Sequence, residues 1–443
     1  MGASWEELGV SLPQILLPKE GTDLTKWAVV ACAQFTSEPE YWHDVEKIVS
    51  GAPSTLSLML PEAYLGAKDL PERIAAIHGR MNALLDEGFF RALPEGTVLV
   101  ERTADGKTRH GLMLAFDLEQ YDYKKGSTSL IRATEGTVES RIPPRLKVRQ
   151  GAALELPHIL ILIDDPEHTV IEPLIGKGEK IYDFDLMQRG GHIEGRFLEN
   201  SALCGLKEAL SALKNRWENR CGAPLLLYAM GDGNHSLATA KAAWEQLRPT
   251  LSEEERMCHP ARYALCELEN LHDAGIVFEP IHRVAFGAGE PEAFLNALRE
   301  ILSAQNPGGA VSVLWGEAAK RETSGHRLDF SCAAGTGSVL VERPASQLPA
   351  GTLEQALEAW KAQSEAGSID YIHGGETARR LGAQPGAMAF LLPAMEKEAL
   401  FTTVILDGAL PKKTFSLGEA NEKRYYLEAR SLRPAQDAQK KPD

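Results

Sequence analysis

Residues 231–236, Gly-Asp-Gly-Asn-His-Ser, combine several reactive groups where an apolar run ends and an alanine-rich helix is expected to begin. Gly231 and Gly233 would let a ligand approach the backbone closely. The unpaired amides and the positive end of the helix dipole would favour a phosphate or carboxylate there. Asp232 could bind Mg²⁺ or accept a proton from a substrate hydroxyl, and His235 could donate to a phosphate or transfer a proton.

Asn234 and Ser236 complete this motif as candidate phosphate ligands. The structural alternative is an ordinary turn, because Asp, Asn and Ser are favoured in turns and at helix N-caps. The motif is neither a P-loop nor a GxGxxG fingerprint. The local sequence alone therefore leaves the two interpretations open.

A second candidate set lies in the polar segment 132–149, which carries four arginines and a pair of prolines. Clustered arginines in an acidic protein suit a phosphorylated ligand, because one guanidinium binds two phosphate oxygens. We predict Arg141, Arg145 and Arg149 as phosphate ligands and Glu135 as a candidate general base. The alternative is a solvated loop with surface ion pairs.

Further polar residues follow strand-like runs in the C-terminal half of the chain. His282 and Arg283 end one run, and His373 precedes two glycines. Lys412 and Lys413 stand beside hydroxyl residues. All five are predicted to face a negatively charged ligand, and the alternatives are an internal ion pair, a turn and a solvated edge strand.

The expected elements alternate between strands and helices, which predicts a mixed α/β (α+β) fold. Residues 24–34 are expected to form a strand, and residues 97–117 a hairpin that turns at Asp105-Gly106. Other strands are expected at 158–165, 223–230, 261–271, 275–286, 311–315 and 338–342, and helices at 198–220, 237–247, 290–303 and 352–365. We expect an N-terminal region over 1–250, a C-terminal α+β region over 251–430 and a disordered tail over 431–443.

Composition and charge narrow the possible functions. A formal net charge of −15 makes nucleic acid an unexpected partner, because phosphate backbones attract basic surfaces. The N-terminus lacks a basic region followed by an apolar core, so no secretory signal is expected. No stretch approaches the roughly 18 apolar residues of a membrane span. The six cysteines contain no CxxC pair, which favours reduced thiols and a cytoplasmic protein.

Four stretches together resemble the family known as domain of unknown function 1015, in an order that extends over roughly residues 25 to 430. They are "GDGNHSLATA", "RATEGTVESRIPPRLKVR", "FEPIHRVAF", and the pair "DYIHGG" and "LPKKTFSLG". The usual family motif reads Asp-Gly-His-His-Arg. Here Asn234 replaces the first histidine and Ser236 replaces the arginine, which removes a strong phosphate ligand.

The same motif resembles the Gly-x-His-Arg loop of the wider superfamily of ParB nucleases and CTPases, sulfiredoxins and the ADP-dependent free serine kinase. This resemblance implies a ParB/sulfiredoxin-like core, with the arginine-rich segment as an insertion in the N-terminal region. Sulfiredoxin chemistry needs a cysteine where this chain has Asn234. The resemblance to the kinase implies that Asp232 lies near a substrate hydroxyl and that Glu38 or Glu40 contributes to the substrate site.

Two functional hypotheses follow. The first is a phosphoryl-transfer enzyme that acts on a small hydroxylated metabolite such as serine or phosphoserine, as a kinase with ADP or ATP and Mg²⁺ or as a phosphatase. The second is a non-catalytic regulator that binds a nucleotide or metabolite. Both imply a small phosphorylated ligand, and both leave the oligomeric state open.

Overall fold

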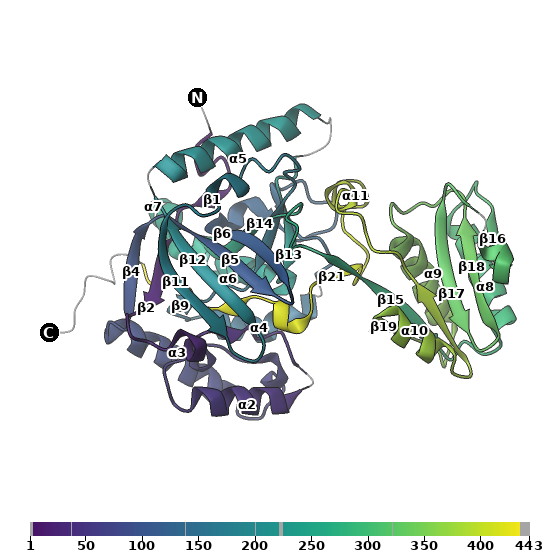
Figure 1. The fold of residues 1–443 in the computed structure, drawn as a ribbon, viewed down its shortest axis with the longest axis horizontal. Helices are drawn as coiled ribbons and strands as arrows, with labels where there is room; N and C mark the ends of the chain where they lie inside the picture. Colours follow the sequence, from purple (N-terminus) through teal and green to yellow (C-terminus); the bar gives the residue numbers. More distant parts are fainter. Residues whose placement is uncertain are drawn as a thin grey trace. The chain divides into compact units, whose positions relative to one another are not determined.

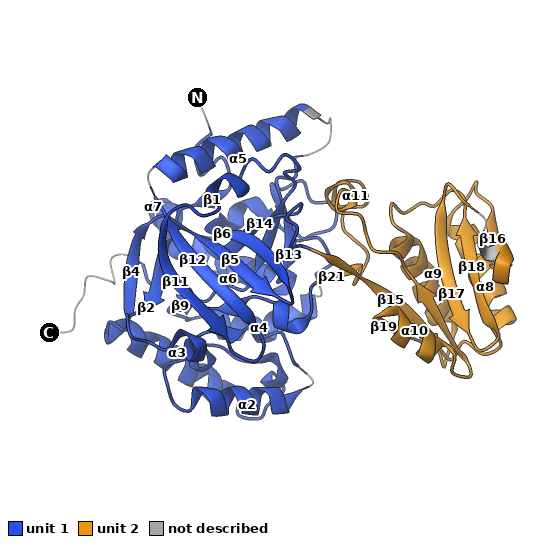
Figure 2. Cartoon of the chain, in the orientation of Figure 1, with its two compact units in different colours: residues 1–276, 418–443 blue, residues 277–417 orange. Residues whose placement is uncertain are grey.

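The computed structural model divides the chain into two compact units, which we describe separately (Figure 2). The first unit contains residues 1–276 and 418–443, and the second contains residues 277–417. The structure describes residues 3–36, 38–137, 139–199, 201–220, 225–320 and 322–434.

Ten strands among the described residues of the first unit form one mixed sheet (Figure 1): β1 (Val10–Ser11), β5 (Thr97–Ala104), β6 (Lys107–Asp117), β7 (Tyr121–Asp122), β8 (Ile131–Arg132), β10 (Leu160–Ile163), β11 (Glu179–Leu186), β12 (Gly191–Leu198), β13 (Tyr228–Asp232) and β14 (Tyr263–Asn270). Their order is β11-β12-β5-β6-β14-β10-β13-β8-β7, and β1 pairs with β6. β10 is parallel to β14 and antiparallel to β13. The register of β10 and β13 sets Leu160 opposite Asp232.

This sheet separates two hydrophobic cores, because successive side chains of a strand point to opposite faces. In β14, Leu265 belongs to one core and Cys266 to the other. The helices α2 (Pro39–Val49) and α3 (Leu70–Asp86) contribute to the core that contains Leu265, and α5 (Ser201–Arg220) and α6 (Asn234–Leu247) contribute to the core that contains Cys266. Figure 1 shows α5 on one side of the strands and α2 and α3 on the other.

The smaller elements of the first unit tie its two chain segments together. They are α1 (Leu24–Trp27), α4 (Ile142–Arg149), α7 (Glu253–Cys258), and the strands β2 (Gln14–Pro18), β3 (Val29–Val30), β4 (Phe90–Glu95), β9 (Leu154–Glu155), β22 (Tyr425–Tyr426) and β23 (Arg430–Ser431). β22 pairs with β3, and β23 pairs with β9. The C-terminal segment therefore completes the unit that the N-terminal residues begin.

A buried ionic cluster also fixes this C-terminal segment to the main sheet. We use that name for Arg109, Glu267, Glu269, Arg424 and Glu428. Arg424 Nε lies 2.9 Å from Glu267 Oε2, and its Nη2 contacts Glu428. Arg109 Nε lies 2.7 Å from Glu269 Oε1. Glu267, Glu269 and Glu428 are fully buried, and Arg424 balances the charges of Glu267 and Glu428, which water cannot solvate.

The second unit has a sheet of its own, with helices packed on it. Within the part of the chain that the structure describes, its order is β16-β18-β17-β20-β15-β19, and β21 pairs with the start of β15. The bounds are β15 (Phe278–Phe286), α8 (Pro291–Gln305), β16 (Val311–Trp315), β17 (His326–Cys332), β18 (Gly335–Val341), α9 (Pro349–Gln363), β19 (Ser368–His373), α10 (Gly375–Gly382), β20 (Ala387–Leu391), α11 (Ala399–Asp407) and β21 (Phe415–Leu417).

The mixed α/β class predicted from the sequence is confirmed. The hairpin is also confirmed, with Asp105 and Gly106 both at positive φ in its turn. The long strand expected over 24–34 is wrong, because Asp23 accepts a hydrogen bond from the Lys26 amide and starts α1 there. Only Val29 and Val30 remain as β3.

The observed division differs from the expected boundary at residue 250. β14 lies inside the first sheet, between β6 and β10, so the first unit extends to residue 276. Residues 431–434 are described, and the rest of the expected tail lies outside the described residues. In the described chain, no helix combines the length and apolar character needed to cross a bilayer.

Candidate functional site

The turn between β13 and α6 has the geometry that its glycine permits. Gly233 adopts φ 83°, and its carbonyl accepts hydrogen bonds from the amides of Ser236 and Leu237 in the first turn of α6. The Gly233 amide donates to Asp232 Oδ1 at 2.8 Å. A Cβ at this position would lie 3.0 Å from Cγ1 of Ile159. The turn therefore needs glycine both for its backbone angle and for the close approach of β10.

A cavity of about 230 Å³ opens at this N-terminal end of α6, and we call it the polar cavity. Three segments that are far apart in the sequence supply its chemistry. Of the residues predicted from the sequence, those in its lining are Glu135, Arg141, Arg145, Asp232, Gly233, Asn234, His235 and Ser236. Gly231 precedes them inside β13 and is outside this lining.

Two arginines from the α4 region give the polar cavity its positive charge. Arg145 Nε donates to Glu62 Oε1 at 2.8 Å, and a second nitrogen of the same guanidinium contacts that oxygen as well. Arg145 Nη1 donates to the carbonyl of Arg141 at 2.7 Å. The Arg141 residue is exposed, and its positive charge acts on His235. The arginine pair thus combines a fixed guanidinium with an accessible one.

Asp232, which lines the polar cavity, contacts a lysine from the C-terminal segment. Lys423 Nζ lies 3.3 Å from Asp232 Oδ2, and about one third of the aspartate side chain is exposed. Burial raises the pKa of Asp232, but the attraction of Lys423 and the hydrogen bond from Gly233 outweigh it, so the pKa is below its usual value. The carboxylate is therefore ionised at neutral pH.

Two imidazoles lie beside this carboxylate, and both are neutral at pH 7. Burial and the charges of Arg145 and Arg141 lower the pKa of His235 to about 4. Burial also lowers the pKa of His158 to about 4, although Asp232 opposes the shift. His158 Nε2 and Ser236 Oγ are 2.8 Å apart, while the buried Nδ1 has no hydrogen-bond partner in the described chain. These rings can accept or donate hydrogen bonds without adding charge.

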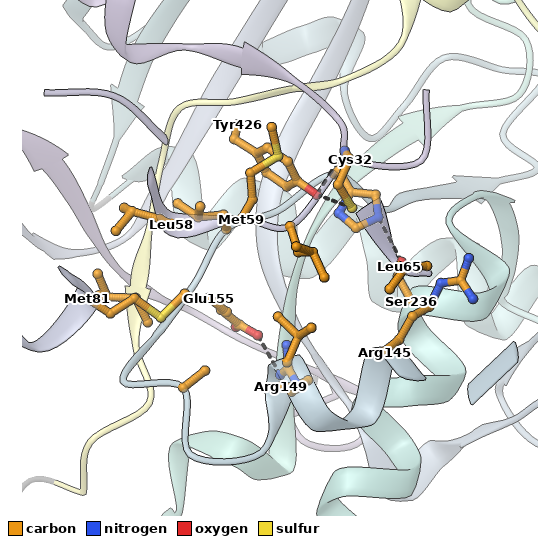
Figure 3. A pocket seen from close by; sticks show the side chains of 16 residues that line it. Cys32, Leu58, Met59, Leu65, Met81, Arg145, Arg149, Glu155, Ser236 and Tyr426 are labelled. Atoms are coloured by element: carbon orange, nitrogen blue, oxygen red, sulfur yellow. Dashed lines mark hydrogen bonds and ion pairs between the residues drawn. The ribbon is translucent and has the colours of Figure 1, made fainter. Parts of the chain in front are cut away.

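A second, mainly apolar cavity of about 150 Å³ adjoins the first, and we call it the apolar chamber (Figure 3). Arg145, His158 and Ser236 line both cavities. Arg149 lines the apolar chamber, where its Nη2 donates to Glu155 Oε2 at 2.7 Å. Arg149, predicted as a phosphate ligand, therefore pairs with Glu155 in the apolar chamber and does not line the polar cavity.

The other five predicted ligands belong to the second unit and have neighbours there. Arg283 is fully buried, with Nη2 donating to the carbonyl of Lys412 and Nε beside Glu354. His282 is also buried, and its Nδ1 accepts a hydrogen bond from the Leu392 amide. The exposed residues of this group are His373, Lys412 and Lys413. Their contact with a ligand stays a prediction.

Three lining residues with polar side chains were missed by the sequence analysis. His158 precedes β10, and the antiparallel register of β10 with β13 brings it to Ser236. Glu62 supplies the N-terminal carboxylate in place of the expected Glu38 or Glu40, which lie at the start of α2 and outside the described lining. Gln34, just after β3, is the third. Of these three residues, only His158 had a local signal in the sequence, which is its position beside an apolar run.

Among the described residues, no three His, Cys, Asp or Glu side chains are grouped so that they could hold a metal ion. Mg²⁺ typically keeps several waters and uses one or two carboxylates together with substrate phosphates. Asp232 and Glu135 are the carboxylates of the polar cavity that fit such a role.

Comparison with protein families gives a match that covers most of the chain. Residues 16–365 match the family described as "Protein of unknown function (DUF1015)", and the chain belongs to this family. Comparison with curated proteins gives no match.

Solved structures with some similarity include a conserved hypothetical protein from Pyrococcus furiosus, at 13% identity and a TM-score of 0.33, covering 71% of this chain and 90% of that one. A free serine kinase in complex with ADP has 11% identity and a TM-score of 0.38, covering 72% and 92%. A C-terminally truncated SbnI from Staphylococcus aureus has 11% identity and a TM-score of 0.33, covering 74% and 90%. Similarity at this level leaves the function to be argued from the cavity itself.

Proposed function

We propose that the polar cavity is the active site of a phosphoryl-transfer enzyme that acts on a small hydroxylated metabolite such as serine or phosphoserine. The observation that carries the proposal is the convergence of Asp232, Arg141 and Arg145 on one cavity at the N-terminal end of α6. An anion site beside an ionised carboxylate can hold a phosphoryl group and a hydroxyl at the same time.

The anionic end of the ligand would lie between the helix and the arginines. The N-terminal turn of α6 presents backbone amides and a partial positive charge. Arg141 and Arg145 can each direct two N–H groups at phosphate oxygens. Ser236 and Asn234 add a hydroxyl and an amide at the same end. In a phosphoryl-transfer transition state, where charge spreads over the equatorial oxygens, these groups would stabilise that charge.

We infer that Asp232 is the residue that acts on the hydroxyl. Because its pKa is lowered, it is ionised at neutral pH and can accept a hydrogen bond from a substrate O–H. In the kinase direction, the hydroxyl oxygen forms the new P–O bond, the bond to the nucleotide breaks, and the hydroxyl proton passes to Asp232. In the phosphatase direction, water takes the place of the metabolite hydroxyl. Glu135 is the alternative proton acceptor in the lining.

ADP or ATP is the proposed phosphoryl donor, and Mg²⁺ is the proposed metal. The arginines and the amides at the start of α6 fit the phosphates of a nucleotide, and Asp232 fits a single carboxylate contact to the ion. Bound Mg²⁺ would supply further neutralisation of phosphate charge.

The test is turnover by the full-length chain. Purified protein would be incubated with serine plus ADP or ATP and Mg²⁺, and separately with phosphoserine, while product is measured. We expect Asp232→Asn to lower turnover at least about 100-fold, as loss of a general base typically does. The matched control is Asp44→Asn, which removes an aspartate from an exposed pair with Lys47. Equal turnover of the two variants would refute the role of Asp232.

A non-catalytic regulator is the second candidate, and the ion pairs of the polar cavity favour it. Asp232 pairs with Lys423 and Glu62 pairs with Arg145, so a ligand could exchange these pairs and thereby move the C-terminal segment. Ser236 also occupies the position where the family motif has arginine. Stabilisation against heat by a nucleotide, with no product from any of these substrates, would favour this regulator over the enzyme.

A further inference from the structure

We propose that the ligand is bipartite, with an anionic head in the polar cavity and an uncharged apolar arm of about six carbons in the apolar chamber. This inference rests on the proposed function and narrows its substrate class.

The first reason is that the two cavities adjoin. Arg145, His158 and Ser236 belong to both linings, so a ligand that contacts Ser236 from the polar side lies next to the apolar chamber. Figure 3 shows Arg145 and Ser236 on one side of the chamber and Met81 and Leu58 on the opposite side. The chamber therefore extends away from Arg145 and Ser236, past the ion pair of Arg149 and Glu155.

The second reason is the chemistry of the chamber wall. It is formed mainly by aliphatic side chains and methionines: Leu58, Met59, Leu60, Leu65, Met81, Val148, Leu154 and Leu156. Methionine adapts its shape to an irregular apolar ligand. An apolar cavity of about 150 Å³ stays dry and accepts a group the size of benzene. The chamber reaches that volume.

The third reason is that several polar groups of the chamber wall already have partners. Glu155 accepts from Arg149 at 2.7 Å, from Arg430 at 2.7 Å and from the Leu265 amide at 2.9 Å. Cys32 and Tyr426 form a hydrogen bond of 3.0 Å with each other. These groups need no hydrogen bond from a ligand, and the aliphatic side chains around them favour a hydrocarbon arm.

Monoalkyl phosphates test the two parts separately. Binding of methyl, butyl and hexyl phosphate to the full-length protein would be measured by calorimetry. We expect the affinity to rise about fourfold for each methylene up to the hexyl chain, as burial of a CH₂ group predicts. Val148→Phe, which fills the chamber from a half-buried position, should remove the gain while methyl phosphate binds as before.

The control is Leu85→Phe, at a half-buried position on α3 that packs on the same core outside the described chamber lining. It should keep the dependence on chain length. If Val148→Phe does not fold, Met81→Ala gives a second test, because a larger chamber should extend the gain to octyl phosphate.

Two negative results are distinguishable. Equal affinity for methyl and hexyl phosphate would overturn the bipartite ligand and leave the anion site of the proposed function standing. No binding of any phosphate, including inorganic phosphate, would overturn the anion site itself and, with it, the proposal for the arm.

Discussion

Replacement of Arg424 by methionine would test whether the buried ionic cluster holds the C-terminal segment on the first unit. The arginine side chain is 1% exposed, and its partners Glu267 and Glu428 are fully buried. Methionine would leave two carboxylates that water cannot reach. Removing one partner from a buried pair typically costs about 3–5 kcal/mol. We expect a loss in that range in the free energy of unfolding of the first unit.

The assay is urea denaturation, with hydrogen exchange of the β14 amides to identify the first unit's transition. The matched control is Arg73→Met, because the Arg73–Asp69 pair is 42% and 54% exposed and should contribute less than about 1 kcal/mol. Adding Glu267→Gln to Arg424→Met should restore part of the loss, since an uncharged amide is less costly to bury. A loss below about 1 kcal/mol for Arg424→Met, or no restoration in the double variant, would refute this reasoning.

Four further outcomes follow from the structure. Arg141→Ala should weaken sulfate binding at least about tenfold, as loss of a charged hydrogen-bond donor implies. Arg80→Ala, on α3 and outside the lining of the polar cavity, should leave sulfate binding unchanged, and calorimetry measures both. Sulfate affinity should stay constant between pH 8 and 6, because the pKa of His235 is about 4, and a rise on acidification would show that this ring gains a proton. Burial raises the pKa of Glu269 to about 8, so its contribution to stability is present below about pH 4.5 and is lost as the pH rises through 8. As the pH rises from about 4.5 to 8, the free energy of unfolding of Glu269→Gln should therefore increase relative to that of the wild type, by at most about 1.4 kcal/mol per pH unit in denaturation experiments. If the difference between the two proteins did not change with pH, the raised pKa of Glu269 would be contradicted. Gly233→Ala should lower the free energy of unfolding by about 1–3 kcal/mol and weaken sulfate binding, because of the φ of 83° at this position and the contact of the new Cβ with Ile159. Gly126 also has a positive φ, but a Cβ there would meet no atom within 4 Å, so Gly126→Ala should destabilise the protein less in a melting experiment.

The parts of the site that the sequence predicted are those whose chemistry is local. The glycines and polar residues of the segment 231–236 are typical of a turn between a strand and a helix. The structure has this turn at Gly233, where β13 ends and α6 begins. Arg141 and Arg145 were predicted from charge and proline content, although the helix α4 that carries Arg145 was not expected in the polar segment. Helix boundaries such as α5 followed from apolar spacing alone.

The parts that were missed depend on pairing over long distances in the chain. Lys423 contacts Asp232, and it lies just before β22, which pairs with β3 from the N-terminal part of the chain. No local pattern in the sequence predicts that contact. His158 reaches Ser236 through the register of β10 and β13. Glu62 replaces Glu38 and Glu40 because α2 carries those two residues away from the cavity lining. Single-sequence periodicity identifies strands but does not say which strands are neighbours.

The return of the C-terminal segment also sets an order of events during protein synthesis. Leu16 pairs with Ala429, and β3 and β9 pair with β22 and β23, so strands made early must wait for partners made much later. Residues 277–417 leave the ribosome before those partners do, and Phe278 pairs with Leu417 at the two ends of that stretch. The second unit can thus close upon itself while the nascent first unit is still incomplete, and the contact of Lys423 with Asp232 forms only once the C-terminal segment has been made.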